Sequence, residues 1–107
     1  MAASDEQFEI GHVLFIDIVG YSKLLIEEQK ERLRRLTDIV LATPQVRRVT
    51  NEQLVRLPTG DGMALVFRNS AEEPAQCAFE IARLLKEHAE IALRMGIHSG
   101  PVSEVLT

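Results

Sequence analysis

Apolar and polar positions follow different periods along the chain, and these periods predict a succession of strands and helices. A short apolar run rich in β-forming residues predicts a buried strand over 12–17. Leucines at helical spacing among Glu, Gln, Lys and Arg predict a helix over 22–41, which Thr43-Pro44 ends. Two further β-like runs, separated by Pro-Thr-Gly-Asp-Gly, predict a hairpin over 52–67.

The rest of the chain predicts one more helix and one more strand. The helix opens at Ser70, whose hydroxyl is placed to accept a main-chain N–H of the first turn. The strand covers 91–100 and ends at Gly100-Pro101. The order strand, helix, hairpin, helix, strand is βαββαβ, which predicts an α+β, ferredoxin-like sandwich: an antiparallel sheet with two helices on one face. In this arrangement the first and third strands are antiparallel neighbours at the centre of the sheet.

Length and charge narrow the class of protein. The 107 residues suit one small domain, which we divide into an N-terminal extension over 1–11 and a domain over 12–107. The formal net charge of −4 offers no basic excess for phosphates, which argues against nucleic acid as a partner. The basic residues of the first helix lie among glutamates and predict a salt-bridged helix face; these are Arg32, Arg34 and Arg35.

The lack of a recognisable targeting signal and the single cysteine favour a cytoplasmic location. No apolar run approaches the roughly 20 residues that span a bilayer, so we expect no direct membrane insertion. The N-terminus lacks the basic start and apolar core of a secretory signal. The single cysteine, Cys77, allows no internal disulfide, which suits a reducing compartment, and it is expected to be a packed, inert thiol.

Two aspartates come together if this topology is right. Asp17 ends the first predicted strand and Asp61 precedes the third. Because these strands are antiparallel neighbours, the end of one faces the start of the other. Two close carboxylates raise each other's cost of ionising unless a cation lies between them, and oxygen ligands suit Mg²⁺ or Mn²⁺. Taken singly, each aspartate also fits a turn residue, so the functional reading depends on the pairing.

The segment between Asp17 and the first helix can receive an anion. Its main-chain N–H groups, with a helix N-terminus behind them, suit phosphate oxygens, and Gly20 allows close approach. For Ser22 the first expectation is the N-cap of the helix, and a phosphate contact is the second. A metal site beside a group of main-chain N–H donors is what a protein needs to bind a nucleoside triphosphate and react it.

Three stretches carry a resemblance to a known family: FIDIVGYSKL (15–24), LPTGDGMALVF (57–67) and RMGIHSGPV (94–102). In order and spacing they resemble three motifs of the class III adenylyl and guanylyl cyclase catalytic domain. The resemblance runs from about residue 12 to residue 103. It implies that Asp17 and Asp61 bind two Mg²⁺ or Mn²⁺ ions and that the carbonyl of Ile18 contacts one ion. The phosphates would be held by Val19, Gly20, Tyr21 and Ser22.

The resemblance also implies a reaction and a partner. The 3′-hydroxyl of ATP, or of GTP, would attack its own α-phosphate and give a cyclic nucleotide and pyrophosphate, with adenylate cyclase activity as the first expectation. One ion would lower the pKa of the hydroxyl and the other would neutralise the triphosphate. The family works as a dimer with its sites at the interface, so a homodimer is expected.

The chain departs from the family pattern at two places. Leu57 occupies the base-selecting position, where many cyclases have lysine or glutamate. The asparagine and arginine that orient the ribose in the family have no match after Pro101, so the domain is expected to be incomplete at its C-terminus and the chain alone inactive. The alternative is a catalytically silent, cyclase-like nucleotide-binding or regulatory module. A haloacid dehalogenase is rejected because Val19 stands where that pattern needs a second aspartate.

Overall fold

The computed structural model describes residues 8–49, 53–68 and 70–103. Within them the chain is α+β, with a four-stranded antiparallel sheet and three α-helices, an arrangement compatible with a ferredoxin-like fold. The elements in chain order are β1 (Phe8–Ile18), η1 (a 3₁₀ turn, Tyr21–Lys23), α1 (Ile26–Ala42), α2 (Pro44–Arg47), β2 (Leu54–Pro58), β3 (Gly62–Phe67), α3 (Glu72–Leu84), η2 (a 3₁₀ turn, Leu85–Glu87) and β4 (Leu93–Ser103).

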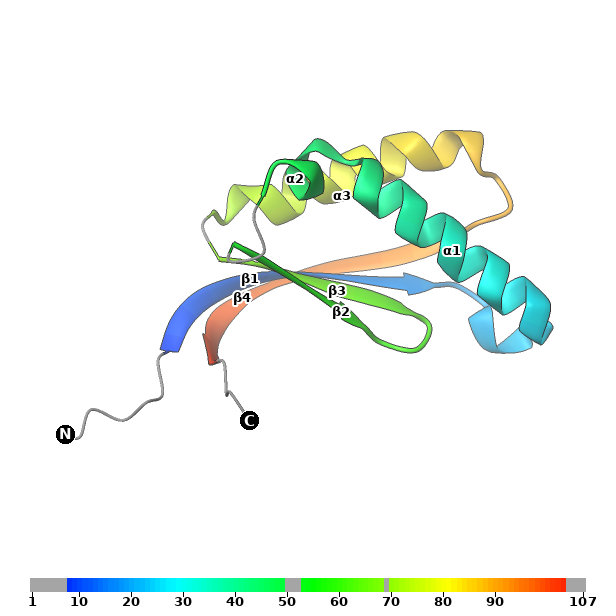
Figure 1. The fold of residues 1–107 in the computed structure, drawn as a ribbon, viewed down its shortest axis with the longest axis horizontal. Coiled ribbons are helices and arrows are strands. Elements are labelled where there is room, and N and C mark those ends of the chain that lie inside the picture. Colours follow the sequence, from blue (N-terminus) through cyan, green and yellow to red (C-terminus); the bar gives the residue numbers. More distant parts are fainter. Residues whose placement is uncertain (1–7, 50–52, 69, 104–107) are drawn as a thin grey trace.

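The sheet has the strand order β2-β3-β1-β4, and every neighbouring pair is antiparallel. The prediction that the first and third strands are central neighbours is therefore confirmed. The helices lie together on one face of the sheet, and the described residues place no helix on the other face (Figure 1). None of the helices that the structure describes combines the length and apolar character needed to cross a membrane.

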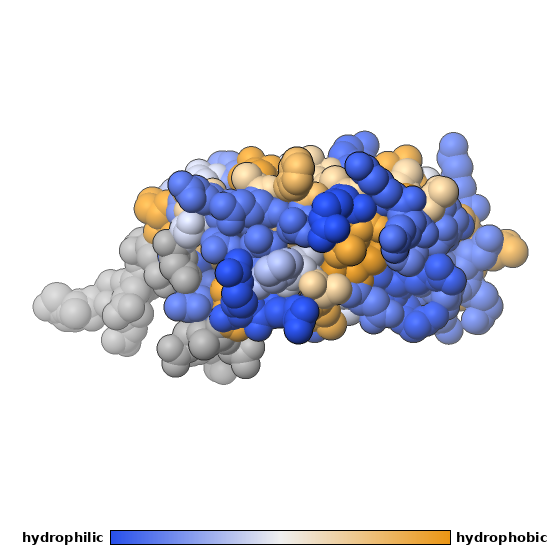
Figure 2. Space-filling view, turned by 90° about the horizontal axis from the view of Figure 1, so that it is seen from above, coloured by the Kyte–Doolittle hydropathy of each residue, from blue (hydrophilic) through white to orange (hydrophobic). Residues whose placement is uncertain are grey.

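The core lies between the sheet and the helices. Alternate residues of β1 point into it, because successive side chains of a strand face opposite sides. Leu14 and Ile16 are fully buried there, and they pack in one cluster with Leu36 of α1 and Ile81 of α3. Seen from the helical side, the surface is mostly hydrophilic, with hydrophobic residues gathered in patches (Figure 2). Burial of this core cluster between the sheet and the helices is the main force that holds the two layers together.

The start of α1 differs from the prediction. Ser22 is not its N-cap, because it lies in η1, and α1 begins only at Ile26. Leu24 is extended, with φ −81° and ψ 151°, so the chain leaves helical geometry between the two elements. The cap of α1 is instead closed by Glu28, whose Oε1 accepts the main-chain N–H of Leu25 at 3.1 Å. Sequence composition could not separate the two helical pieces.

The later elements also shift at their ends. The hydroxyl of Ser70 accepts the N–H of Glu72 at 3.1 Å, but the N-cap of α3 is Ala71 and not the serine, and the helix begins at Glu72. The last strand does not end at Gly100-Pro101 but runs on to Ser103. Proline is tolerated there because β4 is an edge strand, where one missing N–H donor breaks no ladder on the outer side.

Candidate functional site

Asp17 and Asp61 lie at the same end of the sheet, as the sequence predicts. Asp17 is opposite Gly62 in the β1–β3 register, and Asp61 immediately precedes that glycine. The main-chain N–H of Ile18 donates to the main-chain carbonyl of Asp61 at 2.9 Å. Both aspartates are half-buried. We call this region, defined by Asp17, Asp61 and the residues bonded to them, the aspartate end of the sheet.

Glycines make this close approach possible. A methyl group at Gly62 would lie 1.8 Å from the carbonyl oxygen of Ile16, a distance that only a residue without a side chain avoids. Gly60, two residues before it, has φ +90°, and Thr59 N–H donates to the Gly62 carbonyl at 3.2 Å to close the hairpin turn. Sequence analysis read these glycines only as turn residues. The contact with β1 that requires Gly62 became visible only with the strand register.

Asp17 belongs to the face of the sheet that the helices leave open. Its neighbours Ile16 and Ile18 point into the core, so Asp17 points the other way with Phe15. Phe15 pairs with Ala64, and Ala64 pairs with Leu57 on the next strand. Leu57, the predicted base-selecting position, therefore shares this face with Asp17, and its side chain is exposed.

Arg94 is a candidate site residue that sequence analysis missed. It lies directly opposite Asp17 in the β1–β4 register, so the two side chains are on the same open face. It is exposed, and a guanidinium beside a carboxylate that could hold a cation suits a phosphate group. The only signal in the sequence was its place in RMGIHSGPV, and its position relative to Asp17 could not be known without the pairing of the first and last strands.

The predicted phosphate segment is only partly available. Val19 N–H donates to the carbonyl of Ala92 at 2.9 Å, so the amide of Val19 ties this segment to the start of β4 and is not a free donor. A phosphate contact by Val19 stays a prediction, and its amide is already engaged. The amides that follow, of Gly20, Tyr21 and Ser22, stand at the start of η1, where a 3₁₀ turn has no internal acceptor for them.

The local backbone explains how this turn is held. Gly20 has φ +74°, a left-handed conformation that glycine adopts without strain. Its carbonyl accepts the N–H of Lys23 at 3.0 Å. Tyr21 is half-buried against the core, and its carbonyl accepts Nε2 of Gln29 at 3.0 Å, which fixes the turn to α1.

The chemistry of the aspartate end is that of hard oxygen ligands. Among the described residues, no group of three or more His, Cys, Asp and Glu side chains is placed to hold a metal ion. The aspartate end instead offers the carboxylates of Asp17 and Asp61, with Arg94 opposite Asp17 in the strand register. Oxygen-only ligand sets of this size leave positions open for water or substrate oxygens when they bind Mg²⁺ or Mn²⁺.

A hollow of about 390 Å³ lies on the other side of the same hairpin. Its lining joins α1 to the β2–β3 turn and consists of Leu33, Thr37, Arg56, Pro58, Gly60, Gly62 and Met63. Arg56 and not Leu57 faces it, because neighbouring residues of β2 point to opposite sides.

Comparison with known proteins adds no assignment. No protein-family model matches the chain, and no curated protein matches it.

Proposed function

We propose that this chain carries the metal- and phosphate-binding part of a class III nucleotidyl cyclase domain, with a ferredoxin-like core of the cyclase type. The substrate would be ATP, or GTP, and the products a cyclic nucleotide and pyrophosphate. The observation that carries the proposal is the bond from Ile18 N–H to the carbonyl of Asp61, which brings two motifs 44 positions apart (61 − 17) to one end of the sheet.

The chemistry of the proposed ligands, all of them oxygen atoms, suits two divalent cations. Asp17 and Asp61 would hold them with the carbonyl of Ile18, and the half-exposed position of both aspartates leaves room for substrate oxygens. When bound, Mg²⁺ or Mn²⁺ ions supply charge neutralisation of the triphosphate and a lower pKa for the attacking 3′-hydroxyl.

The chain's own groups would bind and orient the triphosphate. The amides of Gly20, Tyr21 and Ser22 are donors at the start of η1, and the guanidinium of Arg94 adds a positive charge on the face that carries Asp17. Leu57 lies on that same face, so an apolar contact would replace the polar base recognition common in the family. We further propose a cytoplasmic homodimer, and little turnover by these 107 residues alone.

A second candidate is a cyclase-like module that binds nucleotide without turning it over. Leu57 favours it, because an exposed apolar side chain offers no hydrogen bond with which to select adenine or guanine. Binding would then be retained and cyclic nucleotide formation absent in any complete dimer.

The test is calorimetric titration with a non-hydrolysable ATP analogue in Mn²⁺. Asp17→Asn removes a proposed ligand, and Asp38→Asn removes an exposed carboxylate of α1 that pairs with Arg34 at 3.7 Å. We expect Mn²⁺-dependent binding by the unchanged chain and by Asp38→Asn, and its loss in Asp17→Asn. Absence of binding by the unchanged chain would contradict the proposed function.

A further inference from the structure

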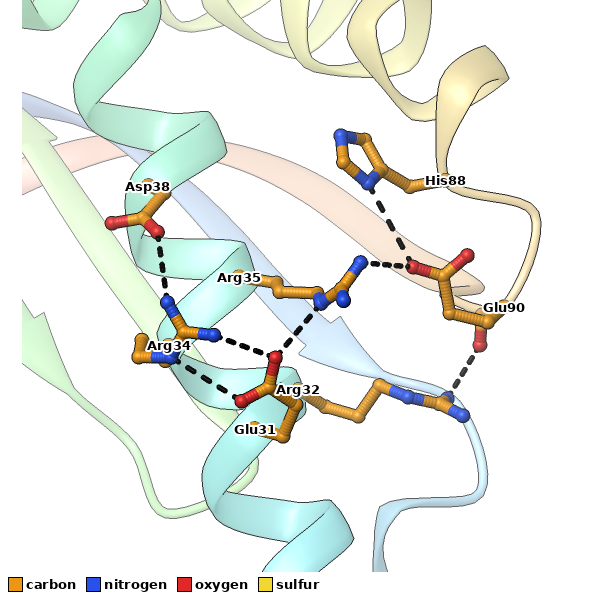
Figure 3. A network of polar contacts seen from close by, with 7 residues as sticks. All are labelled: Glu31, Arg32, Arg34, Arg35, Asp38, His88 and Glu90. Carbon is orange, nitrogen blue, oxygen red and sulfur yellow. Dashed lines mark hydrogen bonds and ion pairs between the residues drawn. The ribbon is translucent and has the colours of Figure 1, made fainter.

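Glu90 is held to helix α1 by both its side chain and its main chain. Arg35 Nη1 donates to Glu90 Oε1 at 2.9 Å, and the guanidinium of Arg32 donates to the Glu90 main-chain carbonyl. His88 Nδ1 lies 3.7 Å from the same carboxylate oxygen. Figure 3 shows these side chains converging on the segment between η2 and β4. We call Arg32, Arg35 and Glu90 the α1 clamp.

The clamp is anchored on α1 as well as on Glu90. Glu31 Oε1 accepts from Arg35 Nε at 3.0 Å and from Arg34 Nη2 at 2.6 Å, so Arg35 is oriented by a carboxylate on its own helix (Figure 3). A guanidinium fixed by one partner loses less side-chain entropy when it binds the next. This makes Arg35 a rigid contact for the segment that contains Glu90.

The clamped segment leads directly into the aspartate end of the sheet. Two residues after Glu90, the carbonyl of Ala92 accepts the N–H of Val19 at 2.9 Å. Ile91, between them, is 5% exposed and belongs to the core. Strand β4 then starts at Leu93, and the next residue, Arg94, lies opposite Asp17. Displacement of Glu90 would therefore reach Val19 through Ala92, two residues on, and Arg94, four residues on.

We propose that Arg32 and Arg35 are positioning residues for this site: by holding Glu90 they keep the Ala92 carbonyl on the Val19 amide and Arg94 opposite Asp17. The part that concerns ligand affinity rests on the proposed function. The part that concerns the position of Val19 does not.

The alternative role for the clamp, a contribution to the free energy of unfolding of the whole domain, explains it less well than positioning does. The side chains of Arg35 and Glu90 are 42% and 40% exposed, and exposed ion pairs contribute little to the free energy of unfolding. The pair Arg83–Glu80 on α3, at 2.7 Å, is a matched control, because it is an ion pair within one helix and does not join α1 to the start of β4.

The first measurement is amide hydrogen exchange at Val19, followed by NMR in the ligand-free protein. The variants are Arg35→Gln, Glu90→Gln and their combination, with Arg83→Gln as the control. We expect exchange at Val19 to speed up about two- to fivefold in either single variant, and by no more than that in the double variant. The control should leave Val19 unchanged. Equal exchange rates at Val19 in Arg35→Gln and Arg83→Gln would overturn the proposal.

The second measurement is the affinity of the same proteins for the ATP analogue in Mn²⁺. We expect Arg35→Gln and Glu90→Gln to weaken it by a similar factor and Arg83→Gln to leave it unchanged. If the unchanged chain does not bind the analogue, the proposed function fails while the exchange rates still decide whether the clamp positions Val19. If exchange rises but affinity stays the same, the positioning of the Val19 amide is supported, and the part of the inference that concerns ligand affinity is overturned.

Discussion

Ile18 and Asp61 are joined by a main-chain hydrogen bond of 2.9 Å, although 42 residues (19–60) separate them in the chain. The bond uses backbone atoms only, so it fixes the main-chain position of Asp61 without using the carboxylate. The side chains of Asp17 and Asp61 thus remain available at the same end of the sheet. This contact depends on the absence of a side chain at the next position, Gly62.

Gly62→Ala is expected to destabilise the fold strongly. The new methyl group would lie 1.8 Å from the carbonyl oxygen of Ile16, which is main chain and cannot rotate away. We expect a loss of roughly 1–3 kcal/mol or more in urea unfolding. Gly96→Ala is the control, because nothing lies within 4 Å of a methyl group there. Similar unfolding midpoints for the two variants would show that β3 does not approach β1 so closely.

Gly20→Ala should lower the free energy of unfolding less than Gly62→Ala does, and for a different reason. Its methyl group would meet nothing within 4 Å, so only the left-handed φ of +74° opposes it. That conformation costs an alanine roughly 1–2 kcal/mol, and asparagine tolerates it better. The midpoint of thermal unfolding should therefore be highest for the unchanged chain, lower for Gly20→Asn and lowest for Gly20→Ala. An alanine variant as stable as the unchanged chain would refute the left-handed turn.

Arg94→Gln tests the residue that the sheet register added to the site. Loss of a charge-assisted contact to phosphate is expected to weaken Mn²⁺-dependent binding of the ATP analogue by roughly tenfold or more. Arg94→Lys should recover part of the affinity, since it keeps the charge but not the planar fork. Unfolding midpoints should change little, because Arg94 is exposed. Equal affinity of Arg94→Gln and the unchanged chain would remove Arg94 from the site.

Cys77 is expected to be unreactive in the folded protein. It is fully buried, and burial raises the pKa of its thiol above the usual 9.0, so the reactive thiolate is disfavoured at neutral pH. A disulfide reagent should label the chain slowly in buffer and rapidly in urea, and the signal is unambiguous because the sequence has one cysteine. Rapid labelling without denaturant would contradict the packed thiol that the sequence predicts.

The same shift has a defined sign in the pH dependence of stability. The folded thiol keeps its proton at a pH where the unfolded thiol has lost it. The contribution of Cys77 is thus fully present below the unfolded pKa, and it is lost as the pH rises from there through the folded pKa. We expect a decline that begins above about pH 9 and is absent in Cys77→Ala, measured as the difference between unfolding curves.

Glu31 should show the opposite pH dependence. Hydrogen bonds from Arg34 and Arg35 hold the pKa of its carboxyl below the usual 4.5. Its stabilising effect is therefore present above that value and is lost as the pH falls through the lower, folded pKa. Glu31→Gln should be slightly less stable at pH 7 and indistinguishable in strong acid. Glu27→Gln is the comparison, since Glu27 lies 3.9 Å from Lys30 and should give a smaller difference at pH 7.

Much of the fold could be predicted from local pattern. The buried run at 12–17, the hairpin around Pro-Thr-Gly-Asp-Gly and the two long helices were all expected, because alternation, turn chemistry and helical spacing are local properties of the chain. Element ends were less predictable. Ser22 has the chemistry of an N-cap, yet the extended Leu24 places it in a separate 3₁₀ turn. Pro101 has the chemistry of a strand end, yet its position in an edge strand lets β4 continue.

By itself, the sequence determined which residues carry charge at strand ends, and with the βαββαβ order it determined that Asp17 and Asp61 converge. Only the tertiary structure decided what surrounds them. The register across β1 and β4 put Arg94 opposite Asp17, and the start of β4 engaged the amide of Val19 through the carbonyl of Ala92. Register and close approach depend on pairings between distant residues, and a shift of one residue would reverse every side chain, so no local pattern could contain them.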